Sequence, residues 1–110
     1  MKRYNSVKRI EKLYAIRYTL KMPSIKKKII VKNKQGLHAR PAALFVQLAN
    51  KFDSRITIKR DNYSEYINGK SIMGILMLGA EEGTAIMVEA DGEDANLAML
   101  ELEKLLNNEE

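Results

Sequence analysis

The chain of 110 residues has no cysteine, no tryptophan and a single histidine. Without cysteine there can be no disulfide, thiolate zinc site, iron–sulfur cluster or thiol nucleophile. One histidine is also too few for an ordinary transition-metal site, so we predict neither a metal nor a cofactor. The one imidazole, His38, is then the side chain whose position most needs explaining.

Long hydrophobic runs are also absent. No stretch approaches the roughly 18 consecutive apolar residues that a membrane span requires. The N-terminus is basic but lacks the apolar segment of a secretory signal. We therefore expect a cytoplasmic protein without a membrane partner, and a length of 110 residues suits one domain.

Positive charge is concentrated at the N-terminus. Residues 1–21 contain seven Lys or Arg and one acid, whereas residues 22–110 contain twelve basic and thirteen acidic side chains. The first segment has marginal helical spacing of apolar residues and no cap, so alone it is expected to be disordered. We predict a basic N-terminal extension over 1–21, outside the functional domain at 22–110, and Met22 is a candidate start of translation.

Hydrophobic periodicity predicts the elements of that domain. Ile56 and Ile58 alternate with polar residues, as in a half-buried strand, and Ala42, Phe45 and Ala49 share one face of a helix. The predicted order is a strand at 25–32, a helix at 39–51, strands at 54–60 and 63–67, a helix at 72–78, a strand at 84–90 and a helix at 93–107. This βαββαβα order predicts an α+β sandwich with helices on one face of a sheet.

The last predicted helix has leucines on several sides, including Leu97 and either Leu100 or Met99, as candidates for the core. Its acidic start, Glu93 and Asp94, is expected to complement the helix dipole.

His38 lies in "GLHARPAAL" (36–44), directly before the first predicted helix. A lone histidine is usually an ordinary core or surface residue, but here it occupies an N-cap-like position. The backbone amides of Ala39 and Arg40 would be free to bind an anion, helped by the helix dipole. The Arg40 guanidinium can fork onto phosphate oxygens, and Pro41 is well tolerated in a first turn. This arrangement favours a phosphoryl group carried on an imidazole nitrogen.

The segments "GLHARPAALFVQLANKF" and "NGKSIMGILMLGAEEGTAIMVEADGEDA" resemble HPr, the histidine-containing phosphocarrier of the bacterial phosphoenolpyruvate:sugar phosphotransferase system. The resemblance covers about 24–107. It implies an open-faced β-sandwich with antiparallel strand order 1-4-2-3 and three helices on one face. It also implies that His38 accepts phosphate on Nδ1 from enzyme I, that Arg40 assists, and that enzyme II A domains receive the phosphate. Such a protein is a carrier and not an enzyme.

Ser71 alone would be read as a helix N-cap. However, "KSIMG" (70–74) resembles the regulatory-serine motif of HPr from low-GC Gram-positive bacteria, which implies an ATP-dependent HPr kinase/phosphorylase as a partner. Ile72 and Met73, with Leu76 one turn on, could be core residues. We expect Ile72 and Met73 to be partly exposed beside the His38 loop, since methionine adapts to several partners. In the family this patch contacts enzyme I, enzyme II A domains and a catabolite-control repressor.

Two features depart from the family: residues 1–21, and a connection, "KRDNYSEYINGK", about two residues longer than usual. Three alternatives remain. A corepressor of carbon catabolite repression, acting through phospho-Ser71 with little sugar-transport flux, fits the helix sequence, although the best-known members lack the histidine present here. A nitrogen-related carrier is disfavoured by "KSIMG". A nucleic-acid module using the basic arm is disfavoured because the folded part offers no stacking platform.

Overall fold

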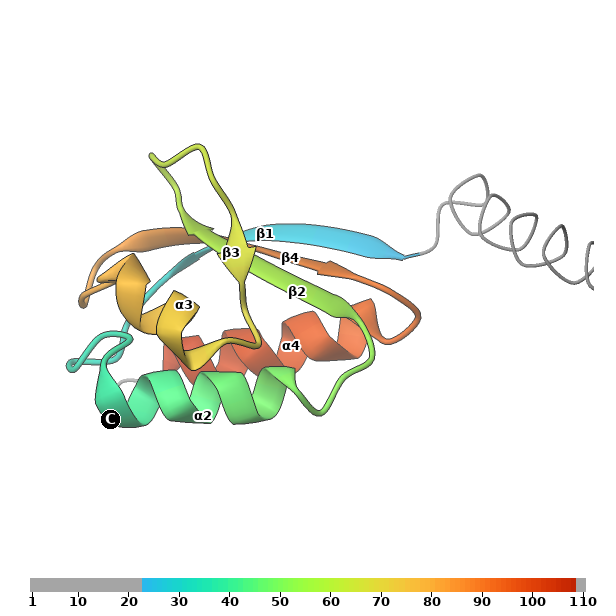
Figure 1. Ribbon diagram of the computed structural model, residues 1–110, viewed down its shortest axis with the longest axis horizontal. Helices are drawn as coiled ribbons and strands as arrows, with labels where there is room; N and C mark the ends of the chain where they lie inside the picture. The colour runs from blue at the N-terminus through green and yellow to red at the C-terminus, as the bar shows by residue number, and fades with distance from the viewer. Residues whose placement is uncertain (1–22, 109–110) are drawn as a thin grey trace, which may run out of the picture.

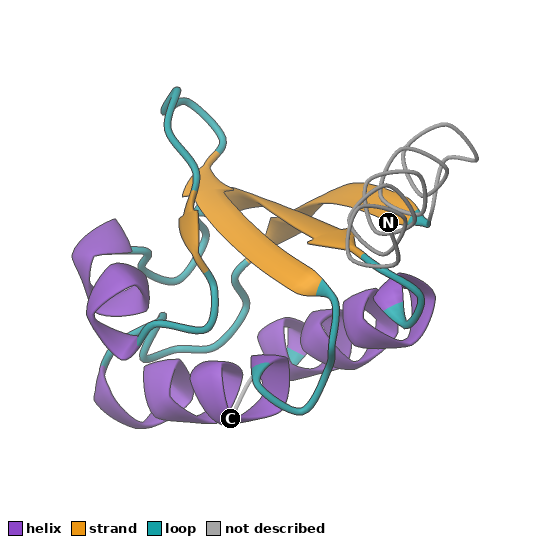
Figure 2. Ribbon diagram, turned by 45° about the vertical axis from the view of Figure 1, so that its right-hand side comes forward, coloured by secondary structure: helices purple, strands orange, loops and turns teal. Residues whose placement is uncertain are grey.

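The computed structural model describes residues 23–108, and the predicted extension 1–21 lies outside them. Four strands form one antiparallel sheet in the order β1-β4-β2-β3, and three helices cover one of its faces (Figures 1 and 2). The predicted architecture is therefore confirmed. The elements are β1 Ser24–Ile30, α2 Ala39–Ala49, β2 Arg55–Arg60, β3 Ile67–Asn68, α3 Ile72–Leu78, β4 Ala85–Asp91 and α4 Ala95–Asn107.

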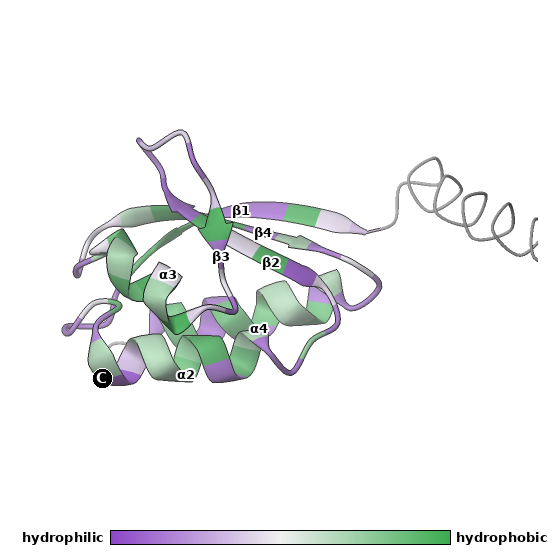
Figure 3. Ribbon diagram, in the orientation of Figure 1, coloured by the Kyte–Doolittle hydropathy of each residue, from purple (hydrophilic) through white to green (hydrophobic). Residues whose placement is uncertain are grey.

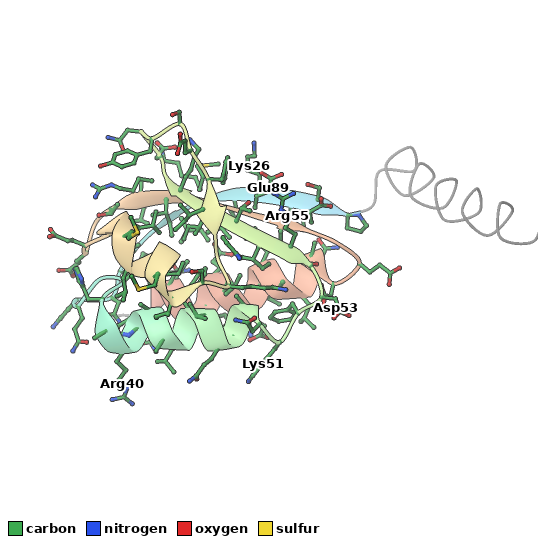
Figure 4. All side chains as sticks on the ribbon, in the orientation of Figure 1. Lys26, Arg40, Lys51, Asp53, Arg55 and Glu89 are labelled. Atoms are coloured by element: carbon green, nitrogen blue, oxygen red, sulfur yellow. The ribbon has the colours of Figure 1, made fainter. Side chains whose placement is uncertain are left out.

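The sheet buries one face because its strands alternate apolar and polar residues. β4 lies between β1 and β2, and its register places Val88 opposite both Lys27 and Ile58. Several side chains that point toward the helices are fully buried, among them Ile58, Ile86 and Val88. The other face carries many polar side chains, and Figure 4 shows Lys26, Arg55 and Glu89 there. The helices thus share a single core with one side of the sheet.

The third strand is much shorter than predicted. The sequence predicts a strand over 63–67, but β3 pairs with β2 only through Ile67 and Asn68. The preceding residues form a loop, in which Lys59 Nζ donates to the carbonyls of Asp61 (3.3 Å) and Tyr63 (2.7 Å). Those carbonyls are accordingly bonded to a side chain rather than to a neighbouring strand.

The last helix also differs from its prediction. It begins at Ala95, its N-cap Asp94 makes no side-chain capping bond, and no acid lies in its first turn. The Asp94 carboxylate instead accepts hydrogen bonds from the backbone N–H of Asp53 (2.8 Å), the N–H of Ser54 (2.9 Å) and the Ser54 hydroxyl. Asp94 therefore ties the start of α4 to the turn before β2. Met99 is buried, whereas Leu97 and Leu100 are about half exposed.

Candidate functional site

His38 is the N-cap residue of α2, as predicted. Its backbone is extended (φ −102°, ψ 171°), and its carbonyl accepts the N–H of Ala42 at 3.0 Å. The imidazole is exposed and makes no capping hydrogen bond within the described part of the chain. The backbone of His38 therefore starts the helix, while its ring is left accessible to another molecule.

The loop before His38 is fixed by residues that follow α3. The Leu37 N–H donates to the Ala80 carbonyl at 2.7 Å, and the Leu37 side chain is buried. Gly36 has φ +65°, and a Cβ placed there would lie 2.5 Å from the same carbonyl oxygen. Only glycine permits this close approach without a shift of the backbone. The chain thus reaches His38 along a path set by Ala80.

The electrostatic character of this helix start is positive. The first N–H groups of a helix have no intrahelical partner and lie at the positive end of its dipole. The first turn of α2 contains no acid, Ala39 and Arg40 are exposed, and Pro41 is buried. Figure 4 shows the Arg40 side chain at the start of α2, extended away from the helices. Ala39 and Arg40 therefore offer backbone amides directly after His38, and Arg40 adds an exposed guanidinium.

Ser71 is the N-cap of α3, and its Oγ accepts the Gly74 N–H at 3.2 Å. The predicted cap is confirmed. Asn50, at the end of α2, donates its side-chain amide to the Lys70 carbonyl at 3.2 Å. Ser71 thus lies beside the end of α2, whereas His38 lies at its start. The two sites therefore lie near opposite ends of α2, whose 11 residues make a helix about 16 Å long.

The exposed side of α3 is apolar, and Figure 3 shows this helix as mainly hydrophobic. We define the α3 patch as Ile72, Met73, Leu76 and Met77, whose side chains are 39%, 64%, 38% and 80% exposed. The expected exposure of Ile72 and Met73 is confirmed, and Leu76 joins them. Met77 was not predicted, although its position one turn after Met73 is a signal that could have identified it.

The C-terminal end of α3 is next to the His38 loop, because Ala80 follows that helix and bonds to Leu37. One side of the molecule therefore combines an exposed imidazole, a positive helix end and an apolar patch. Over residues 23–108, no three His, Cys, Asp or Glu side chains come together as a metal site would need. None of the helices in that range is long and apolar enough to cross a bilayer.

Comparison with known families gives one model that covers most of the chain. The model described as "PTS HPr component phosphorylation site" matches residues 25–108. Among curated proteins, phosphocarrier protein HPr of Xylella fastidiosa (strain 9a5c) is 46% identical over 80 residues, covering 73% of this chain and 88% of that protein. HPr-like protein Crh of Bacillus subtilis (strain 168) is 41% identical over 85 residues, covering 77% and 98%.

Solved structures give the same result. A crystal structure of phosphocarrier protein HPr from Bacillus anthracis str. Ames has a TM-score of 0.71 and 42% identity, covering 76% of this chain and 96% of that one. The solution structure of Crh from Bacillus subtilis has a TM-score of 0.60 and 41% identity, covering 78% and 100%. The similarity in fold is thus accompanied by similarity in sequence over most of the described residues.

Proposed function

Because this chain belongs to the HPr family of phosphocarriers, we propose that His38 accepts a phosphoryl group from enzyme I and passes it to enzyme II A domains. The observation that carries the proposal is the exposed imidazole at the start of α2, next to amides that can bind phosphate oxygens. The same proposal makes the chain a cytoplasmic carrier that is itself phosphorylated and dephosphorylated, rather than an enzyme. It needs no cofactor of its own.

The proposed chemistry is one bond exchange in each direction. Nδ1 of His38 attacks phosphorus, forming a nitrogen–phosphorus bond as the bond between phosphorus and enzyme I breaks. The second transfer reverses this on the enzyme II A domain. Phosphoryl transfer depends mainly on positioning and on stabilisation of charge on the equatorial oxygens. The Ala39 and Arg40 amides would bind those oxygens, and the Arg40 guanidinium would add a charged donor.

We further propose that Ser71 is a regulatory site for HPr kinase/phosphorylase. Its hydroxyl is half-buried at the start of α3 and already accepts a helix amide. A phosphate there would remain near the positive end of the helix, so little refolding is required. Because Ser71 and His38 lie near opposite ends of α2, the effect would arise at the α3 patch, where a dianion penalises partners with acidic or apolar docking faces.

A second function is supported by the similarity to Crh. In this alternative the chain is a corepressor of carbon catabolite repression that binds the catabolite-control repressor through phospho-Ser71 and carries little sugar-transport flux. His38 favours the carrier, since the alternative makes no use of an accessible imidazole. The match over 25–108 supports a functional domain at 22–110, with residues 1–21 outside it.

The deciding experiment is incubation with enzyme I and phosphoenolpyruvate, followed by mass spectrometry at basic and then acidic pH. We expect a gain of one phosphate that survives base, is lost in acid and is absent from His38→Ala. The Ser71→Ala variant is the matched control and should still gain it. A wild-type chain that gains no phosphate from enzyme I, yet is phosphorylated on Ser71 by the kinase, would overturn the carrier proposal in favour of the corepressor.

A further inference from the structure

Arg60, the last residue of β2, reaches across to the end of α3. Its Nη1 donates to the carbonyls of Gly79 at 3.2 Å and of Leu78 at 3.4 Å. The guanidinium carbon lies 5.3 Å from the centre of the Tyr63 ring. Its Nε is buried without a hydrogen-bond partner among the described residues. Since an unpaired buried N–H is costly, packing alone explains this arginine poorly.

The end of α3 needs the donor that Arg60 provides. This helix has only seven residues, ends at Gly79 in the left-handed conformation (φ +59°) and has no basic residue in its last turn. The final carbonyls of a helix lack intrahelical partners and form the negative end of its dipole. The Arg60 guanidinium, which comes from β2, donates hydrogen bonds to the carbonyls at this helix end and places a positive charge at the negative end of the dipole. Arg60 therefore fixes the C-terminal end of α3 to the sheet.

The end of α3 is in turn hydrogen-bonded to the loop that precedes His38. Ala80 follows Gly79 directly, is buried, and accepts the Leu37 N–H at 2.7 Å. Leu37 precedes His38, and the close approach at Gly36 leaves the loop little room to move. A displacement of the α3 end would therefore be transmitted to His38 through one short hydrogen bond.

We propose that Arg60 is a positioning residue, which holds the α3 patch and the His38 loop in one fixed arrangement. Tyr63, in the connection after β2, covers the guanidinium and keeps it directed at α3. Through Tyr63 this connection would contribute to the transfer reaction. This inference rests on the proposed function for its effect on transfer, whereas the structural coupling can be measured without any phosphate.

The coupling is tested by amide hydrogen exchange on the unphosphorylated, full-length chain. We expect Arg60→Met to speed exchange of the Leu37 amide about tenfold, while the central-strand amide of Val88 is unchanged. Lys28→Met is the matched control, since Lys28 forms an exposed ion pair with Asp61 of the same connection (3.2 Å), which involves neither Tyr63 nor α3. It should leave Leu37 protected. Equal protection of Leu37 in Arg60→Met and wild type, or an equal loss at Leu37 and Val88, overturns the proposal.

Two milder variants keep the test valid if Arg60→Met does not fold. Arg60→Lys retains a cationic donor and should preserve most of the Leu37 protection. Tyr63→Leu leaves the arginine in place without its aromatic cover, and should raise Leu37 exchange about threefold, less than the loss of the charged donor. If Leu37 exchanges faster in Arg60→Lys than in Tyr63→Leu, a cationic donor at position 60 is not what holds the end of α3.

Transfer kinetics provide the functional test. With enzyme I, Arg60→Met should lower kcat and raise the KM for the carrier, each by about threefold to tenfold, because both the loop and the patch shift. Lys28→Met should change neither. Normal kcat and KM in Arg60→Met overturn the positioning role. If wild type accepts no phosphate at all, the proposed function fails, and the exchange experiment still decides the coupling.

Discussion

At the scale of single residues, Gly36 and Gly83 provide a matched pair. Both have positive φ, but a Cβ at Gly36 would meet the Ala80 carbonyl oxygen at 2.5 Å, whereas nothing lies within 4 Å of one at Gly83. We expect Gly83→Ala to lower the free energy of unfolding by about 1 kcal/mol through backbone strain alone. Gly36→Ala should cost ~3 kcal/mol or more, because the Leu37–Ala80 contact must also open.

Urea unfolding of the two alanine variants and wild type checks this difference. Phosphate acceptance should fall only in Gly36→Ala, since Gly36 leads into the His38 loop and Gly83 lies in an exposed turn. Equal loss of stability in the two variants would show that the close approach at Gly36 contributes nothing.

The Asp94 carboxylate contributes to the pH dependence of the free energy of unfolding. The Ser54 hydroxyl, then the Asp53 amide, hold the pKa of the Asp94 carboxyl below its ordinary value of 3.8. A carboxylate with a lowered folded-state pKa stabilises the fold above its unfolded-state pKa, and this stability is lost as pH falls through the folded-state value. We therefore expect Asp94→Asn to lower Tm near neutral pH.

Thermal unfolding as a function of pH measures the effect. The difference in Tm between wild type and Asp94→Asn should be largest near neutral pH and shrink as the pH falls below the ordinary carboxyl pKa of 3.8 and through the lowered folded-state pKa. Asp61→Asn is a suitable control, since Asp61 forms an exposed ion pair with Lys28 at 3.2 Å and contacts of that kind contribute little. A difference in Tm that stays constant with pH would contradict the role given to the Asp94 carboxylate.

At the scale of the elements, the Ser71 cap holds the start of α3. Its hydroxyl accepts the Gly74 N–H, and loss of such a cap costs about 1 kcal/mol. We expect Ser71→Ala to lower the free energy of unfolding by that amount in chemical denaturation. Ser71→Asp should retain most of the stability, because aspartate is also a good cap. A Ser71→Ala variant as stable as wild type would show that the helix does not depend on its cap.

Comparing the predicted and observed helices and strands shows where hydrophobic periodicity alone predicts an element and where it does not. Strands and helices with one buried face were predicted within about two residues of their ends, because alternating or helical spacing marks that face directly. The strand predicted at 63–67 is present as the antiparallel partner of β2, but only Ile67 and Asn68 pair. Local pattern does not reveal that the residues before them form a loop in which Lys59 binds two carbonyls. In α4, leucines occur on several sides, so spacing alone did not separate the buried Met99 from the exposed Leu100.

Across the whole molecule, the unpredicted parts of the site depend on contacts between residues distant in sequence. Local sequence placed His38 and Ser71 as N-caps, because caps are set by their own helices. It did not place Ala80 against Leu37 or Asp94 against Ser54, each pair being about 40 residues apart. Such pairs form only when the sheet brings the elements together, and no local rule identifies them.

The last prediction concerns the whole chain and its first 21 residues. The buried core extends from Ile29 to Leu106, and the family match covers 25–108. We therefore expect a chain that starts at Met22 to unfold at a Tm within about 2 °C of the full-length protein. It should also accept phosphate from enzyme I at an unchanged rate, since His38 and the α3 patch are retained. A lower Tm, or slower acceptance at matched ionic strength, would assign residues 1–21 to the functional domain.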